Sequence, residues 1–236
     1  MRKPIFAEEL SDRQAQVLVH IMANIGSSPE HMHYIKSEEY LSDIFPIDLA
    51  IFEPTEFVDY YVAQTVGLSS YYFTENFARS ELLMLLPKTW KPIFDREEYK
   101  WPLGLLLDIA YGMVENKVGP MIGQVYMPNG EEIVSPATDA VGAIITLAEH
   151  LPMELYEVKV NDTYTRYFQV VPITKDDVEK IEEHGSTNFI RYNLHDSDGP
   201  QMVVKLKEKQ PRGIDRLIKQ NEDSLKGKKT SNTTKK

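Results

Sequence analysis

The sequence has no cysteine, no long apolar run and no apolar segment behind its basic first residues. Without cysteine the chain forms no disulfide, thiolate metal site or cysteine nucleophile, which is typical of a reducing compartment. The apolar stretch at 105–110 is far shorter than the ~20 residues of a membrane span. The first six residues lead directly into Glu8 and Glu9, unlike a signal peptide. We therefore expect a cytoplasmic protein that does not enter a membrane.

Motifs for nucleotide binding and catalysis are also missing from the sequence. It contains neither Gly-x-Gly-x-x-Gly nor a phosphate-binding loop that ends in Gly-Lys-Ser/Thr. His31 and His33 lack a third ligand at a metal-binding spacing. The stretch 67–71 begins like a nucleophile elbow around Ser69, but its final glycine is absent. We expect no cofactor, no metal and no catalytic residue, with a hydrolase that uses Ser69 or a carboxylate pair as the alternative.

Charge is distributed unevenly along the 236 residues. Residues 1–204 carry 15 basic and 32 acidic side chains, whereas residues 205–236 carry 11 basic and four acidic ones. The acidic part repels phosphate backbones, so we do not expect this domain to bind nucleic acid. The end of the chain has too few apolar residues to offset its ordering entropy. We predict a folded domain over 1–208 and a disordered basic tail over 209–236, which solubilises the protein, folds back on the acidic body or contacts a polyanion.

The spacing of apolar residues indicates an α+β fold, because helical and strand patterns do not alternate regularly. The predicted helices span 11–25, 101–116, 174–185 and 186–195. The predicted strands span 31–35, 44–52, 57–66, 121–127, 132–134, 141–148, 155–160 and 164–171, while 77–86 fits either a strand or a helix. Turn residues predict hairpins at 128–130 and at 161–162. We expect a largely antiparallel or mixed sheet covered by helices.

Several blocks resemble the suppressor of fused-like domain and occur in that family's order over residues 44–195. They are Pro46-Ile47-Asp48-Leu49 with Glu53-Pro54-Thr55, Thr65-Val66-Gly67-Leu68-Ser69, the run from Glu81 through Pro87 to Trp90, Trp101-Pro102-Leu103, and the run from Phe168 to Ile173. Residues of these blocks also have a structural reading as turn formers, element boundaries and large core residues. The residues assigned this structural role are Thr65, Gly67, Leu68, Ser69, Glu81, Pro87, Trp90, Trp101 and Pro102.

The resemblance implies a mixed domain without a catalytic centre. In animal members this domain is the first half of a longer protein that binds a transcription-factor peptide partly by strand addition. Stand-alone members are typical of bacteria, and some are thought to neutralise toxins. We therefore predict a protein-interaction module, an immunity protein or adaptor, whose partner is a basic toxin or regulator. The candidate contact residues are Tyr71, Tyr72, Asp48 and Glu53.

Overall fold

The computed structural model describes residues 10–28, 31–33, 47–73, 79–91, 93, 96–149 and 151–195. All of them belong to the first of two compact units, Met1–Leu206 and Lys207–Lys236. The strands form one eight-stranded sheet with the order β1-β2-β3-β4-β8-β6-β5, and β7 pairs with β8. The strands are β1 (His31–His33), β2 (Asp48–Phe52), β3 (Tyr61–Val66), β4 (Arg79–Leu86), β5 (Val125–Tyr126), β6 (Ala140–Thr146), β7 (Glu157–Val160) and β8 (Thr163–Thr174).

Helices flank this sheet, and every described strand pair is antiparallel except the parallel pair β4–β8. The expected α+β class with a mixed, largely antiparallel sheet is therefore confirmed. None of the described helices is long and apolar enough to cross a membrane. The helical segments are α1 (Asp12–Ile25), η2 (Leu68–Ser70), α2 (Glu97–Asn116), η3 (Met153–Tyr156), α3 (Lys175–His184), α4 (Ser186–Phe189) and the π-helical η4 (Ile190–His195).

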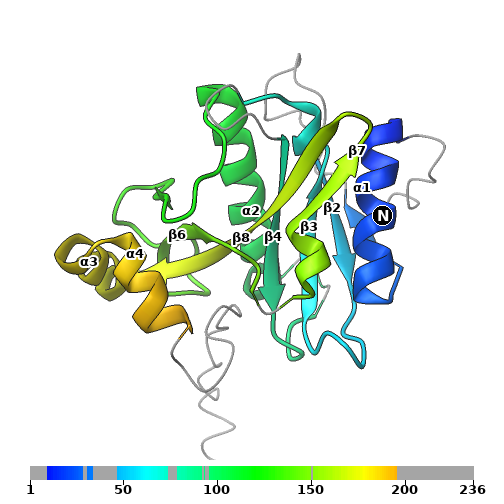
Figure 1. Cartoon of the computed structure of the whole chain (residues 1–236). Coiled ribbons are helices and arrows are strands. Elements are labelled where there is room, and N and C mark those ends of the chain that lie inside the picture. The colour runs from blue at the N-terminus through cyan, green and yellow to red at the C-terminus, as the bar shows by residue number, and fades with distance from the viewer. Residues whose placement is uncertain are drawn as a thin grey trace, which may run out of the picture. The chain divides into compact units, whose positions relative to one another are not determined.

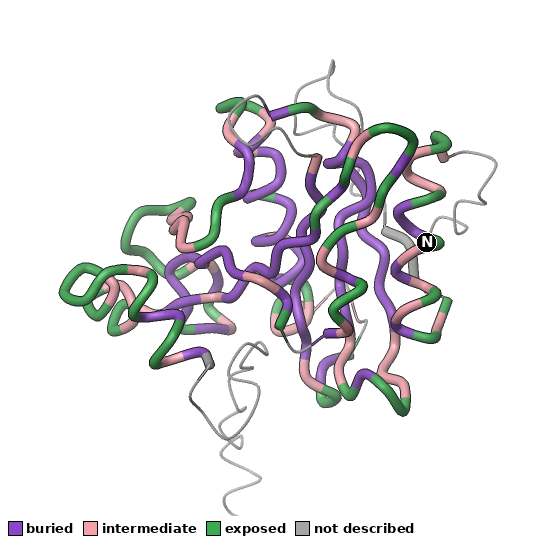
Figure 2. Tube along the Cα trace, in the orientation of Figure 1, coloured by how far each residue is buried: buried purple, intermediate pink, exposed green. Residues whose placement is uncertain are grey.

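The sheet is buried on both faces, with α1 and α2 on opposite sides (Figure 1). Alternate residues of β4 enter different cores. Leu82 and Met84 pack with α2, whereas Leu83 and Leu85 pack with α1. Figure 2 shows the central strands buried along their length. A central strand therefore reads as a continuous apolar run, and this explains the ambiguous pattern predicted at 77–86, of which residues 79–86 form β4.

The ends of the helices follow local signals to different degrees. A capping box of Ser11 and Gln14 starts α1, and Gly26 ends it in the left-handed conformation, so the helix predicted at 11–25 is confirmed. The prediction that Trp101-Pro102 opens the next helix is wrong, because α2 begins at Glu97. Glu97 and Glu98 favour its first turn through the helix dipole. Pro102 then lies inside the helix, where it donates no backbone hydrogen bond.

The two predicted hairpins have different outcomes. The turn at Asn161 joins β7 to β8, with Val160 opposite Thr163, so this hairpin is confirmed. The hairpin predicted around 128–130 is wrong. The turn forms locally, since the Gly130 N–H donates to the Met127 carbonyl at 3.2 Å. The strand before this turn, however, pairs with the apolar β6 rather than with residues 132–134.

The backbones of β5 and β6 approach each other closely at Gly142, and a substitution at this position tests that pairing. A Cβ atom at this position would lie 2.1 Å from the backbone oxygen of Tyr126. We expect Gly142→Ala to lower the free energy of unfolding by about 3 kcal/mol, the upper end of usual overpacking costs. The matched control is Gly104→Ala in α2, where a Cβ meets nothing within 4 Å. This change should stabilise the protein by up to about 1 kcal/mol in urea denaturation. Equal effects of the two substitutions would contradict the described β5–β6 pairing.

Candidate functional site

Two of the family-like blocks meet at a buried carboxylate. Glu81 of β4 is completely buried, as are Thr65 at the end of β3 and Ser69 in η2. The N–H groups of Gly67 and Ser69 donate to Glu81 Oε1 at 3.1 Å each, and the Thr65 hydroxyl donates to Glu81 Oε2 at 2.6 Å. Gly67 has φ of +122°, a conformation that other residues rarely adopt. One side chain thus fixes the N–H groups of the turn that follows β3.

Thr65 also continues the pairing of β3 with β4. The backbone ladder between these strands reaches Gln64 opposite Leu83. At the next position, the Leu82 N–H donates to Thr65 Oγ1 at 2.8 Å, in place of a backbone acceptor. The hydroxyl therefore closes the end of the ladder and at the same time orients Glu81. A threonine is suited to this place because its hydroxyl both donates and accepts.

Burial raises the pKa of Glu81, and the hydrogen bonds from Thr65, Ser69 and Gly67 oppose this shift. The surroundings accommodate either protonation state. When Glu81 is protonated, Oε2 can donate to Thr65 Oγ1, while the threonine proton turns to the Leu82 carbonyl at 3.3 Å. The turn keeps its contacts in both states, so the carboxyl group has the geometry of a structural anchor.

Arg79 holds the opposite side of the same turn. Its Nη1 donates to the carbonyl oxygens of Ser69 at 2.9 Å and Ser70 at 2.8 Å. The Arg79 guanidinium carbon also lies 5.8 Å from the ring centroid of Tyr72, at cation–π distance. Glu81 and Arg79, two positions apart on β4, therefore clamp the turn from its N–H side and its carbonyl side. We call residues 67–72 with these two side chains the clamped turn.

The clamped turn carries the two tyrosines that the sequence marked as contact residues. Tyr72 is 51% exposed, whereas Tyr71 is half-buried and packs against the core beneath α2. This arrangement leaves one aromatic ring at the surface on a fixed backbone. A rigid, partly exposed tyrosine has the properties of a protein-contact residue.

The other two candidate contact residues lie in different surroundings. Asp48 was predicted as a contact residue, but it is only 2% exposed, which disfavours that role. The reason is that all five residues of β2 are buried, since both faces of this strand are covered. Glu53 is half-buried just after β2. A contact between Asp48 and a partner would require the sheet to open, whereas Tyr72 is accessible as it stands.

Sequence reasoning missed a third charged side chain next to this cluster. Arg13 of α1 donates to Thr165 Oγ1 at 3.1 Å and to Thr163 Oγ1 at 2.7 Å on β8. Burial and the nearby Arg79 lower the pKa of Arg13, and the Glu81 carboxylate opposes this. A polar residue in the first turn of an amphipathic helix gives no sequence signal for such a role. Only the pairing of β4 with β8 brings these residues together.

The remaining family-block residues occupy the core or delimit elements. Leu68 and Trp90 are completely buried, and Trp101 is 4% exposed. Pro87 follows the last residue of β4, and its carbonyl accepts from the Trp90 N–H at 2.8 Å. Within the described part of the chain, no three histidine, aspartate or glutamate side chains are grouped as metal ligands.

The model of the suppressor of fused protein (SUFU) family matches residues 45–207 of this chain. No curated protein matches the sequence. Among solved structures, a suppressor of fused homolog from Neisseria gonorrhoeae is 14% identical with a TM-score of 0.54, and the match covers 73% of this chain and 84% of that one.

Two further structures share the fold. A chain of the Sufu–Fu complex is 14% identical with a TM-score of 0.59, and the match covers 87% of this chain and 93% of that one. Drosophila Suppressor of Fused is 16% identical with a TM-score of 0.55, and the match covers 87% of this chain but only 53% of the Drosophila protein. The family match covers more than half of the sequence, so the chain belongs to the suppressor of fused protein (SUFU) family.

Proposed function

We propose that this chain is a non-catalytic protein-interaction module, an immunity protein or adaptor, that binds a basic partner protein. The observation that carries the proposal is the exposed Tyr72 ring on the clamped turn, which Arg79 and Glu81 hold in place. A contact residue on a fixed backbone loses little conformational entropy on binding. Family membership supports the proposal, since one structural relative comes from a complex, the Sufu–Fu complex.

Charge supports a basic partner. Residues 1–204 carry 32 acidic and 15 basic side chains, and a surface of this sign accelerates encounter with a basic protein. We place this function in the cytoplasm, where a chain without cysteine is indifferent to the reducing conditions.

The buried state of Ser69 disfavours the hydrolase alternative. The Ser69 side chain has no exposed surface, so a substrate would not reach its hydroxyl. The backbone N–H of Ser69 donates to the Glu81 carboxylate, which also accepts hydrogen bonds from the Thr65 hydroxyl and the Gly67 N–H. A carboxylate in this position orients a turn, whereas a general base must reach the nucleophile's proton in a site that substrate can enter.

The test is affinity capture from native lysate at low salt, followed by titration of the captured protein. We expect one basic protein to be enriched in stoichiometric amount and to be released as ionic strength rises. Tyr72→Ala should weaken its binding about 30-fold, as expected for a tyrosine hot spot of about 2 kcal/mol. The matched control is Tyr164→Ala, since Tyr164 is 49% exposed and Tyr72 is 51% exposed. The proposal fails if no protein is enriched or if both variants bind as wild type does.

A further inference from the structure

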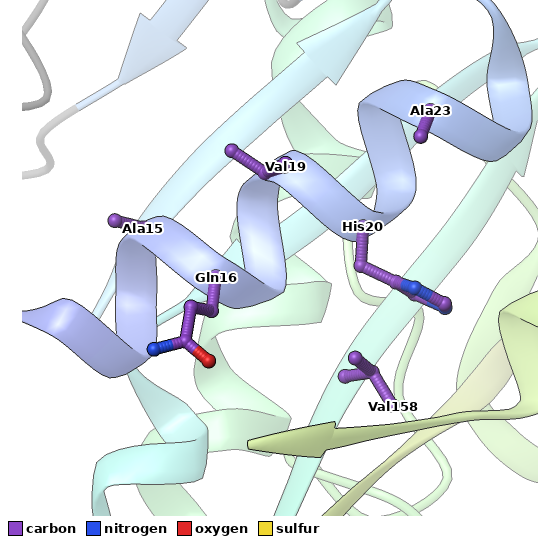
Figure 3. Close-up of a pocket in the computed structure, with 6 residues that line it drawn as sticks. All are labelled: Ala15, Gln16, Val19, His20, Ala23 and Val158. Atoms are coloured by element: carbon purple, nitrogen blue, oxygen red, sulfur yellow. The ribbon is translucent and has the colours of Figure 1, made fainter. Parts of the chain in front are cut away.

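A shallow groove lies between the outer side of α1 and strand β7 (Figure 3). Val19, which is 62% exposed, lies on the outer side of α1 and points away from β7, whereas Val158 of β7 lies near His20. The groove has a volume of about 460 Å³, and a second hollow of about 400 Å³ lies next to Val19 toward the end of α1. We call the two hollows together the α1 groove. It is lined by Ala15, Gln16, Val19, His20, Met22, Ala23, Gly26, Ser27, Ser28 and Val158.

Among the residues that the structure describes, the core side chains of α1 lie away from the α1 groove. The buried side of α1 is formed by Val17, Leu18, Ile21 and Ile25, which already pack against the sheet. Val19 therefore points away from the core by helical periodicity. A single exposed valine is ordinary, but one beside two apolar hollows marks a surface that can receive a side chain.

Polar contacts hold α1 against the neighbouring parts of the fold. The Tyr167 hydroxyl of β8 donates to the Val17 carbonyl at 3.1 Å. His20 Nε2 lies 2.7 Å from the Glu154 carbonyl, which can only accept, so this nitrogen carries the proton. The Thr55 hydroxyl donates to the Ile25 carbonyl at 3.1 Å near the end of the helix. Because α1 is fixed at several points, the groove is preformed, and an occupant does not have to order it.

The size of the groove indicates one helix as its occupant. From Ala15 to Ala23 the helix rises about 12 Å, which corresponds to roughly two helical turns of a partner. Ten residues line the two hollows. A stable interface between globular proteins uses about 20–30 residues on each side, so the groove is too small for a second copy of this chain. It is sufficient for apolar anchors at i, i+3 or i+4, and i+7 of a docked helix.

The charged residues around the α1 groove indicate which side chains should flank the apolar stripe of the docked helix. None of the ten lining residues is an aspartate, glutamate, lysine or arginine, and the apolar side chains among them lie beside the polar Gln16, His20, Ser27 and Ser28. Asp12, in the first turn of α1, and Glu154, whose carbonyl meets His20, are exposed. The excess of acidic over basic residues in 1–204 also favours a basic occupant. A helix with basic residues beside its apolar stripe complements this surface.

We propose that the α1 groove binds a short amphipathic helix with basic flanks, supplied by a partner protein. The inference rests on the proposed role in protein binding and adds a second contact surface, distinct from the clamped turn. The groove's apolar floor accepts the helix's apolar anchors, and its acidic surroundings favour a basic partner.

The test is an NMR titration of the ¹⁵N-labelled full chain with a synthetic three-turn peptide that has a leucine stripe and lysine flanks. We expect saturable shifts of the amides of Val19, Ala23 and Val158. Val19→Glu should weaken binding at least tenfold, whereas Ile122→Glu, at a position that is 55% exposed elsewhere, should leave it unchanged. A control peptide of the same composition without a leucine stripe should produce no saturable shift.

Three results would overturn the proposal. One is equal binding of the control peptide, and another is unchanged binding by Val19→Glu. The third is a wild-type dimer in light scattering that Val19→Glu dissociates, which would assign the groove to a second copy. The failure of this proposal and that of the proposed function are distinguishable. A captured partner that is lost with Tyr72→Ala but retained with Val19→Glu rejects the groove alone.

Discussion

Replacing Glu81 with alanine should lower the free energy of unfolding by about 3–5 kcal/mol, as when one partner of a buried charged network is removed. The substitution leaves the N–H groups of Gly67 and Ser69 without their acceptor in a fully buried place, and the Thr65 hydroxyl keeps only the Leu82 carbonyl at 3.3 Å as an acceptor. It also removes the negative charge that lies close to Arg13. Urea denaturation followed by circular dichroism measures the loss.

Two further variants show whether the hydrogen bonds are responsible. Glu81→Gln keeps an oxygen for the two N–H groups and places an amide opposite Thr65 Oγ1, so its cost should be smaller than that of alanine. Glu157→Ala is the surface control, since Glu157 forms an exposed pair with Arg166 at 3.4 Å and should change stability by less than about 0.5 kcal/mol. If Glu81→Ala matches this control, Glu81 does not anchor the turn.

The pH dependence of the same variants tests the direction of the Glu81 pKa. Burial raises this pKa in the folded protein above the ordinary value of a glutamate, so the folded state binds the proton more tightly than the unfolded chain. The contribution of Glu81 to stability is therefore greatest below the ordinary pKa and falls as pH rises through the raised one. The stability of wild type relative to Glu81→Gln should decrease over this window and stay constant above it. A rise over the same window would mean that the pKa is lowered.

Local signals in the sequence were sufficient for several elements. The capping box of Ser11 and Gln14 and the apolar spacing behind it fix α1, and Asn161 marks the β7–β8 turn. Both signals act over a few residues, where propensity and turn chemistry decide the structure. The turn at Gly130 does not decide which strand pairs with β5. That partner is β6, which lies further along the chain, and no turn residue encodes this pairing.

The candidate site shows the same division between local and long-range information. The sequence placed Thr65, Gly67, Ser69 and Glu81 in family-like blocks, but the hydrogen bonds that join them cross up to 16 positions. The register of β3 with β4 brings these residues together. Asp48 was predicted as a contact residue, and such a role would fit a strand with one solvated face, yet β2 is covered on both faces. Burial on both faces is a property of the assembled sheet.

Replacing Trp90 with alanine should also lower the free energy of unfolding by about 3–5 kcal/mol, the usual cost of deleting a buried tryptophan. Trp90 is completely buried, and its ring meets Tyr61 edge-on with the centroids 5.3 Å apart. Its Nε1–H donates to the Tyr99 carbonyl at 3.0 Å and so joins the end of β4 to the first turn of α2. Thermal and urea unfolding should both show the loss.

The second tryptophan provides the control, since the chain has only two. Trp101 is 4% exposed, and no described residue offers an acceptor to its Nε1. Trp90→Phe removes a satisfied hydrogen bond, whereas Trp101→Phe removes a buried N–H that has none, so Trp90→Phe should cost more. Each variant retains one tryptophan, whose fluorescence reports its own unfolding transition. Equal costs would show that the Trp90–Tyr99 hydrogen bond does not help to hold α2 against the sheet.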